Sequence, residues 1–143
     1  IIQTMLTENI HLLVSHTNIL IRKICTSNNI SLSQYFTINN IDSDGTSMSE
    51  LSFRLGLDNS TMTRNINILL KRSLVTKNPS TLDKREQLIS LSKQGNALVS
   101  KLDDEFNTHF NHIVSDIDIS IKEKFIDFIQ QLNWKMSCHI NEL

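Results

Sequence analysis

Residues that interrupt helices are scarce in this chain, and this scarcity limits the folds open to it. Its 143 residues include only 3 glycines and 1 proline. A β-sandwich or a disulfide-stapled scaffold needs many turns, and glycine is the residue that tight turns most often require. Long helices are therefore expected to dominate. A chain of this length is expected to form one domain with a sizeable core.

Both ends of the chain show the three-and-four spacing of amphipathic helices. Residues 5–26 form the first such stretch, and a second runs from Leu98 to Ile117. Ser120, followed by Glu123, has the spacing of a capping box and is expected to start a last helix. These flanking helices carry more apolar surface than one small domain can cover, which predicts an intertwined helical dimer.

Capping signals divide the middle of the chain into short helices. Capping boxes begin at Ser31 and at Ser47. The helix that starts after Ser47 is expected to stop at Gly56, and Asp58 or Asn59 is expected to cap the next one. Two short helices joined by so tight a turn are typical of a helix-turn-helix.

The second helix of this pair has two contrasting faces. Met62, Ile66, Leu69 and Leu70 are expected to be buried. The residues expected to point outward are Ser60, Thr61, Thr63, Arg64 and Asn67. Hydroxyl, amide and guanidinium groups on the first turns of a helix can contact both phosphates and base edges in a major groove. These five residues are therefore the predicted recognition surface for double-stranded DNA.

Two short strand-like runs follow, at residues 74–77 and 86–91, with a charged cluster between them. A hairpin placed after a helix-turn-helix is the wing of a winged-helix domain. Lys84 and Arg85 at its tip are expected to reach the DNA backbone or the minor groove. Asp83 is expected to orient Arg85 and not to contact DNA itself.

The net charge of −1 hides a local basic region. The basic residues between positions 59 and 93 are Arg64, Lys71, Arg72, Lys77, Lys84, Arg85 and Lys93, and the acidic ones are Asp83 and Glu86. Most remaining acidic residues crowd the last third of the chain. A basic region confined to the predicted winged helix suits a local anionic partner.

These residues resemble the bacterial multiple antibiotic resistance regulator (MarR) family. The wing pattern of that family, Asp-x-Arg, then Leu-Thr, then a helix with glycine, is matched by Asp83, Arg85, Leu91, Ser92 and Gly95. The stretches "SMSELSFRLG" and "LDNSTMTRNINILLKRSLV" are similar to the two helices of its helix-turn-helix. The resemblance covers about residues 30 to 95, and the flanking helices match by length and pattern.

The resemblance implies a mainly α fold, a winged helix-turn-helix with flanking dimerisation helices. Residues 1–143 would form a single domain, with a DNA-binding region at 30–95 and dimerisation helices at 1–28 and 96–143. It implies a cytoplasmic homodimer that binds a pseudo-palindromic operator, usually as a repressor, and releases it when a small ligand or another signal acts. No cofactor is implied.

Two positions depart from the family pattern. Ser73 stands where the family usually has glycine after the recognition helix, which predicts a helix end without a positive φ. Lys77 stands where arginine is frequent, so the charge is kept and the bidentate fork is lost.

Two alternative functions stay open on the sequence alone. One is a winged-helix module that binds proteins and not DNA. The other is a regulator that senses oxidants or metals through Cys25, or through His109 and His112, which stand one helical turn apart. No carboxylate-rich companion motif accompanies these histidines, so no metal site is expected, and a buried inert thiol is the favoured interpretation of Cys25.

The sequence contains no motif that would indicate an enzyme or a membrane protein. It lacks a glycine-rich phosphate loop and the GxSxG and HExxH patterns, so an enzyme is not expected. No apolar run approaches the roughly 18 residues of a membrane-spanning helix, and no leader peptide opens the sequence. Cys25 and Cys138 lie far apart without a CxxC spacing, which agrees with reduced thiols and a cytoplasmic location.

Overall fold

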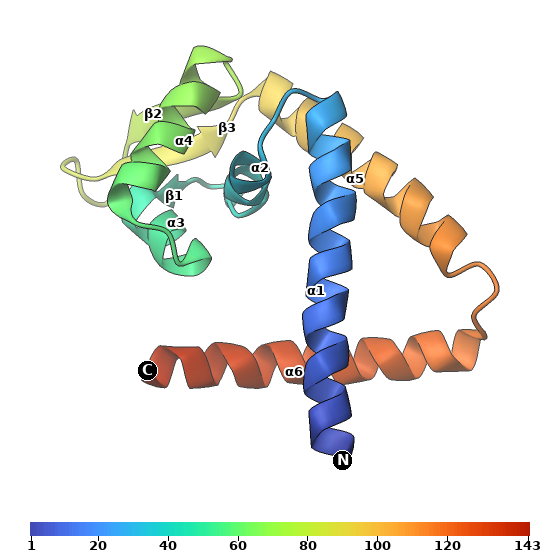
Figure 1. Cartoon of the computed structure of the whole chain (residues 1–143). Helices are drawn as coiled ribbons and strands as arrows, with labels where there is room; N and C mark the ends of the chain where they lie inside the picture. The colour runs from blue at the N-terminus through green and yellow to red at the C-terminus, as the bar shows by residue number, and fades with distance from the viewer. The chain divides into compact units, whose positions relative to one another are not determined.

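The computed structural model describes all 143 residues and divides them into two units, residues 1–107 and 108–143. Helices dominate, as predicted (Figure 1). The helices are α1 (Ile2–Ser27), α2 (Leu32–Asn39), α3 (Met48–Leu55), α4 (Asn59–Lys71), α5 (Lys93–Ile113) and α6 (Ile119–Glu142). The strands are β1 (Thr46–Ser47), β2 (Val75–Pro79) and β3 (Gln87–Leu91).

The three strands form one small antiparallel sheet in the order β1-β3-β2. Strands β2 and β3 are the predicted hairpin, and Val75 pairs with Leu91 at its base. Strand β1 was not predicted, because two residues are too few to show an alternating pattern. Its Thr46 pairs with Ile89, the fully buried centre of β3. The segment that enters α3 is thereby fastened to the wing.

The core of the first unit lies where α2, α3 and α4 pack against this sheet. Its fully buried apolar residues are Ile38, Leu51, Met62, Ile66, Leu69, Ile89 and Leu102. The last third of α1 joins the core through Ile21, Ile24 and Cys25, whereas the earlier turns of that helix expose many of their apolar side chains. Of the predicted inner face of α4, Met62, Ile66 and Leu69 are buried and Leu70 is half-buried. The predicted stripe of α1 is only partly buried.

In the last third of the chain two local predictions are wrong. Helix α5 ends at Ile113, so Ile117 lies in the turn and not on the helix. Helix α6 is capped by Asp118, whose carboxylate accepts from the Ser120 backbone N–H at 2.8 Å, and not by Ser120 itself. A carboxylate accepts from the free N–H groups at a helix N-terminus, and its negative charge also interacts favourably with the helix dipole.

The end of the recognition helix α4 also differs from the prediction. Ser73 adopts a positive φ of 56° although it carries a side chain. Its N–H bonds to the Leu70 carbonyl at 3.0 Å, and the Leu74 N–H bonds to the Leu69 carbonyl at 3.0 Å. This pair of bonds is a Schellman motif, which requires a left-handed residue after the helix. The geometry usually made by glycine is thus kept by serine.

The start of α5 is hydrogen-bonded to the carbonyl groups next to this helix end. The Ser92 hydroxyl donates to the Ser73 carbonyl at 2.6 Å, and the Ser92 N–H donates to the Leu74 carbonyl at 3.0 Å. The Ser92 hydroxyl oxygen also accepts from the Gly95 N–H at 3.0 Å, which caps α5. A Cβ on Gly95 would lie 1.9 Å from the Leu74 carbonyl oxygen, so only glycine fits there.

We predict that Ser73→Gly stabilises the protein. A left-handed residue with a Cβ costs about 1 to 2 kcal/mol, and the greater freedom of glycine in the unfolded chain offsets about 0.4 to 1 kcal/mol of that gain. The net rise in the free energy of unfolding should be about 1 kcal/mol, which is a few degrees in the thermal midpoint. Ser73→Ala keeps the Cβ and is the matched control. An equal midpoint for the glycine and alanine variants would contradict the prediction.

Candidate nucleic-acid interface

The first turns of α4 present most of the predicted recognition residues to solvent. Ser60, Thr63, Arg64 and Asn67 are exposed. Thr61 is half-buried, and its hydroxyl donates to the Asp58 carboxylate at 2.7 Å. Four of the five residues therefore form one outward polar face, and Thr61 belongs to the helix cap.

Asp58 caps α4 with both carboxylate oxygens. One accepts from the Thr61 N–H at 2.8 Å, and the other accepts from the Thr61 hydroxyl. These backbone and side-chain hydrogen bonds from Thr61 hold the pKa of Asp58 below its usual range. The cap fixes the start of the helix and therefore the directions of the side chains on its first turns.

A buried amide sets the rotation of α4 about its axis. Asn65 is 5% exposed, and its side-chain NH₂ donates to the Ser33 hydroxyl of α2 at 2.7 Å and to the Thr37 hydroxyl at 3.4 Å. Sequence reasoning did not single it out, although its position beside Met62 and Ile66 on the apolar face is a visible signal. A buried polar group that loses its partner is costly, so these bonds favour one rotation.

Arg72 is withdrawn from the basic surface. Its guanidinium donates to the Asn29 carbonyl, and to the Asn28 carbonyl at 3.4 Å, where it caps the C-terminal end of α1. The sequence placed this arginine in the basic region. The exposed cations of that region are Arg64, Lys71, Lys77, Lys84, Arg85 and Lys93.

The helix before α4 is tied to the loop that precedes it. The Arg54 guanidinium forms two hydrogen bonds with the Asp42 carboxylate, at 2.8 and 3.1 Å, and one with Glu50 at 2.6 Å. Hydrogen bonding from Arg54 lowers the pKa of Asp42. This arginine is exposed, but its charge is paired with the carboxylates of Asp42 and Glu50, so it adds no free cation to the surface.

The wing tip is a closed turn built on the buried residue Ser80. The Ser80 N–H donates to the Glu86 carbonyl at 2.8 Å, and the Glu86 N–H donates to the Asp83 carbonyl at 3.0 Å. The Asp83 carboxylate accepts from the Arg85 backbone N–H at 2.9 Å. Asp83 therefore contacts the Arg85 backbone, while the side chains of Lys84 and Arg85 are exposed.

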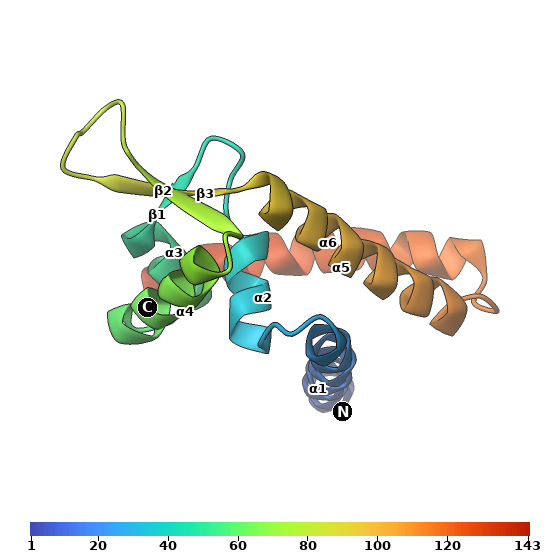
Figure 2. The ribbon, with the colours of Figure 1, turned by 90° about the horizontal axis from the view of Figure 1, so that it is seen from above.

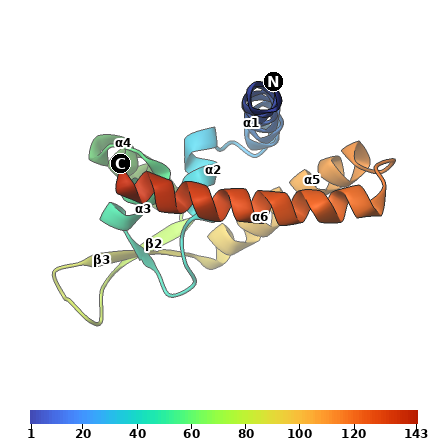
Figure 3. The ribbon, with the colours of Figure 1, turned by 90° about the horizontal axis from the view of Figure 1, so that it is seen from below.

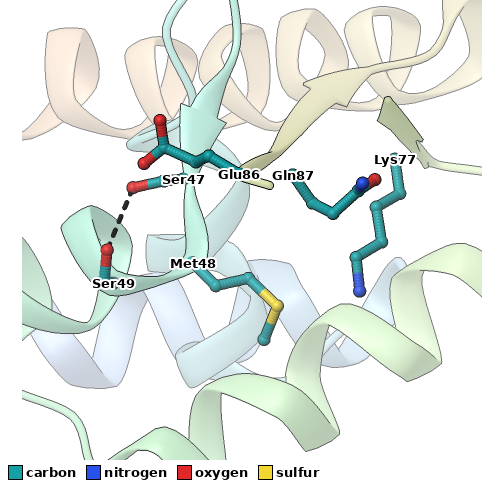
Figure 4. Close-up of a pocket in the computed structure, with 6 residues that line it drawn as sticks. All are labelled: Ser47, Met48, Ser49, Lys77, Glu86 and Gln87. Carbon is teal, nitrogen blue, oxygen red and sulfur yellow. Dashed lines mark hydrogen bonds between the residues drawn. The ribbon is translucent and has the colours of Figure 1, made fainter. Parts of the chain in front are cut away.

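An open hollow of about 270 Å³ lies between the start of α3 and the wing hairpin (Figure 4). Its lining residues are Ser47, Met48, Ser49, Lys77, Glu86 and Gln87. The lining offers hydroxyl, amide and ammonium donors, and Glu86 supplies one opposing carboxylate. Lys77, the second departure from the family pattern, lies in this hollow and is exposed.

Comparison with known proteins settles the family. Residues 30–87 match the model of the MarR family. This winged-helix part of the chain therefore belongs to the MarR family. Because MarR-family proteins are transcriptional regulators, the broad function is regulation of transcription. A search of curated protein sequences found no match.

Solved structures share the MarR-type fold across most of the chain. The transcriptional regulator BldR from Sulfolobus solfataricus has a TM-score of 0.78 at 15% identity, over 93% of this chain and 95% of that one. Wild-type apo MarR from E. coli has a TM-score of 0.77 at 18% identity, over 89% and 96%. CouR from Rhodococcus jostii RHA1, bound to p-coumaroyl-CoA, has a TM-score of 0.70 at 18% identity, over 89% and 93%. At these identities the likeness concerns the fold, and it confirms the predicted winged helix.

The residues considered for sensing do not form a metal-binding cluster. No three His, Cys, Asp or Glu side chains gather as a metal site requires. Cys25 is 1% exposed, and burial raises the pKa of its thiol, against a smaller opposite effect of the Arg22 charge. A buried thiol with a raised pKa reacts slowly, because the thiolate is the reactive form. No helix is long and apolar enough to cross a membrane.

We predict that the Asp58 cap makes stability depend on pH. The pKa of Asp58 is lower in the folded state, so its charge stabilises the fold above the unfolded pKa of about 3.9, and this contribution is lost as the pH falls through the folded pKa. Asp58→Asn keeps a capping oxygen without the charge. Thermal midpoints of the two proteins should differ near neutral pH and converge in acid. A difference that is constant with pH would count against an ionised cap.

Proposed function

We propose that the protein binds a pseudo-palindromic DNA operator as a homodimer, represses transcription there, and leaves the operator when a small ligand or other signal acts. Residues 30–95 would bind DNA, and residues 1–28 and 96–143 would form the dimer. The observation that carries the proposal is the exposed polar face of α4, formed by Ser60, Thr63, Arg64 and Asn67, beside a wing with a cationic tip. Such a helix fits a major groove while the wing contacts the adjacent backbone or minor groove.

Each exposed group has a distinct expected role. Arg64 and Asn67 carry the long donors that read guanine and adenine edges, whereas Ser60 and Thr63 suit phosphates or close base contacts. Thr61 is proposed to act through the cap, since its hydroxyl is bonded to Asp58. Lys77 and the start of α3 form a hollow with donors suited to a backbone phosphate.

The dimer proposal is supported by apolar surface that the chain itself leaves open. No residue of α6 is buried, and Phe125, Phe128 and Trp134 are 48%, 43% and 72% exposed. On α1, Leu12 and Ile19 are 52% and 53% exposed. A second copy of the chain would cover such faces by symmetry.

A signal received by the flanking helices has a physical connection to the recognition helix. Glu105 of α5 accepts from the Asn28 side-chain amide at 3.3 and 3.2 Å. The Asn28 and Asn29 carbonyls in turn accept from Arg72 at the end of α4. A shift of α5 against α1 would thus act on the C-terminal end of α4. CouR, which shares the fold, was solved with a bound acyl-CoA, which supports a small-molecule effector as the signal.

Two arginine substitutions test the DNA-binding surface. If Arg85 contacts the backbone or a narrow minor groove, Arg85→Ala should weaken binding to operator and unrelated DNA alike and lower the salt slope by about one phosphate equivalent per subunit. If Arg64 reads a base edge, Arg64→Ala should cost roughly 1 to 3 kcal/mol per half-site on the operator and much less on unrelated DNA. Affinities measured on both DNAs across a salt series separate these roles.

The matched control is Arg54→Ala, which removes an arginine whose charge is already paired with Asp42 and Glu50. This substitution should lower the thermal midpoint of the protein and leave the salt slope of DNA binding unchanged. If both Arg64→Ala and Arg85→Ala bind DNA at low salt as tightly as the wild type, the proposed DNA contacts are wrong. That result would favour the protein-interaction module instead.

The dimer is tested on α6. Replacing Phe125 and Phe128 by serine should convert the dimer to a monomer, measured by light scattering, because both side chains are substantially exposed in the lone chain and would be covered by the partner. Lys124→Ser, on an exposed position of the same helix, should leave the dimer intact. A dimer that survives the double substitution would rule out this face of α6 as the interface.

A further inference from the structure

An apolar side chain projects from the tip of the wing. Leu82 is 97% exposed, whereas the other strongly exposed apolar residues of the first unit lie on α1, at the residue before it or, like Phe53 at 73%, on α3. The loop between β2 and β3 extends away from the helices of its unit (Figures 2 and 3). Water therefore surrounds a leucine in the loop at the end of the wing hairpin.

The backbone that carries Leu82 is held in place. The Ser80 hydroxyl accepts from the Leu82 N–H at 3.2 Å and from the Asp83 N–H at 3.4 Å. Ser80 itself is 5% exposed and directly follows the last residue of β2, so it anchors the loop to the hairpin. A turn tied to a buried residue on both sides of the leucine presents that side chain in one direction. Little chain entropy is then lost when the tip binds a partner.

Cations flank the leucine without being engaged in the protein. Lys84 and Arg85 are exposed, and neither takes part in an ion pair of the structure. The nearest carboxylate, Asp83, accepts from the Arg85 backbone N–H. The tip thus combines one projecting aliphatic group with two free cations a few residues away.

We propose that Leu82 is an apolar wedge that enters the minor groove of the operator and partly unstacks one base step under each wing. This inference rests on the proposed DNA binding and adds a positioning and specificity role that hydrogen bonding does not supply. Aliphatic side chains kink a duplex in this way, and neighbouring cations hold the phosphates on either side. Pyrimidine–purine steps unstack at the lowest cost, so the wedge selects such a step without any base-edge contact.

A protein partner fits this tip less well. Thr81 and Asp83, the chain neighbours of Leu82, are polar and exposed, so the apolar surface is one side chain wide. Protein interfaces bury many residues around an apolar centre. Insertion between two base pairs needs only one aliphatic group of this size.

The test uses the full-length protein and a duplex selected from a random-sequence pool by the wild type. Leu82→Ala should weaken binding to this duplex roughly tenfold while the salt slope stays that of the wild type, because an apolar contact releases no counterions. Leu82→Met, which retains an aliphatic wedge, should restore most of the affinity. Thr81→Ala is the matched control at the same tip and should leave the affinity unchanged.

Two readouts report the wedge itself. The wild type should raise the fluorescence of 2-aminopurine placed at the step under the wing, and should shorten the end-to-end distance of a doubly labelled duplex. Leu82→Ala should lose both signals and Leu82→Met should keep them. Unchanged fluorescence and bending in the alanine variant would overturn the wedge. If Leu82→Ala changes the oligomeric state but neither DNA signal, Leu82 belongs to a protein contact and the wedge is also overturned. If the wild type retains no duplex at all, the proposed function fails, and the wedge fails with it.

Discussion

One backbone carbonyl, that of Leu74, connects three elements of the winged helix. It follows the left-handed Ser73, accepts from the Ser92 N–H, and leaves no room for a side chain on Gly95. The end of α4, the first residue before β2 and the start of α5 therefore meet at one place. Because buried backbone groups must be paired, this meeting point sets where the wing and α5 leave the recognition helix. The positions of both parts of the candidate interface depend on it.

The orientation of the recognition helix depends on polar contacts inside the fold. Apolar packing of its inner face allows small rotations, whereas the Asn65 amide satisfies its donors on α2 in one orientation only. At the opposite end, Arg72 attaches the same helix to the end of α1. A helix fixed at its N-terminal cap, its middle and its end presents its outward residues as a rigid set. Rigid presentation is what selective recognition of a groove requires.

The winged helix and the flanking helices differ in how far the chain covers its own apolar surface. The winged-helix part closes a core that includes residues without measurable exposure, such as Leu51 and Ile89. Helix α6 buries none of its residues, and large parts of α1 are equally open. A single protomer thus leaves its flanking helices unsatisfied, which is the physical basis for proposing a dimer. Regulation by such a protein would then follow from how the partner subunits sit against each other.

Local signals were readable from the sequence because their partners lie within a few residues. The Ser31 capping box, the stop at Gly56 and the cap at Asp58 are all confirmed, as are the helical character of the chain and the hairpin of the wing. The family and the winged-helix fold follow from the same patterns and are confirmed by comparison. The DNA contacts assigned to Arg64 and Arg85 stay predictions.

What only the tertiary structure decided involves partners far away in the chain. Strand β1 exists because Thr46 meets Ile89, and the start of α5 is held at the end of α4 because the Ser92 hydroxyl donates to the Ser73 carbonyl. Arg72 does not belong to the basic surface, because its guanidinium donates to the carbonyl of Asn29, 43 residues earlier in the chain. The sequence by itself determined helix and strand types through capping chemistry and apolar spacing. Long-range pairing of backbone and polar groups, which no local pattern encodes, determined which of its side chains remain free to bind.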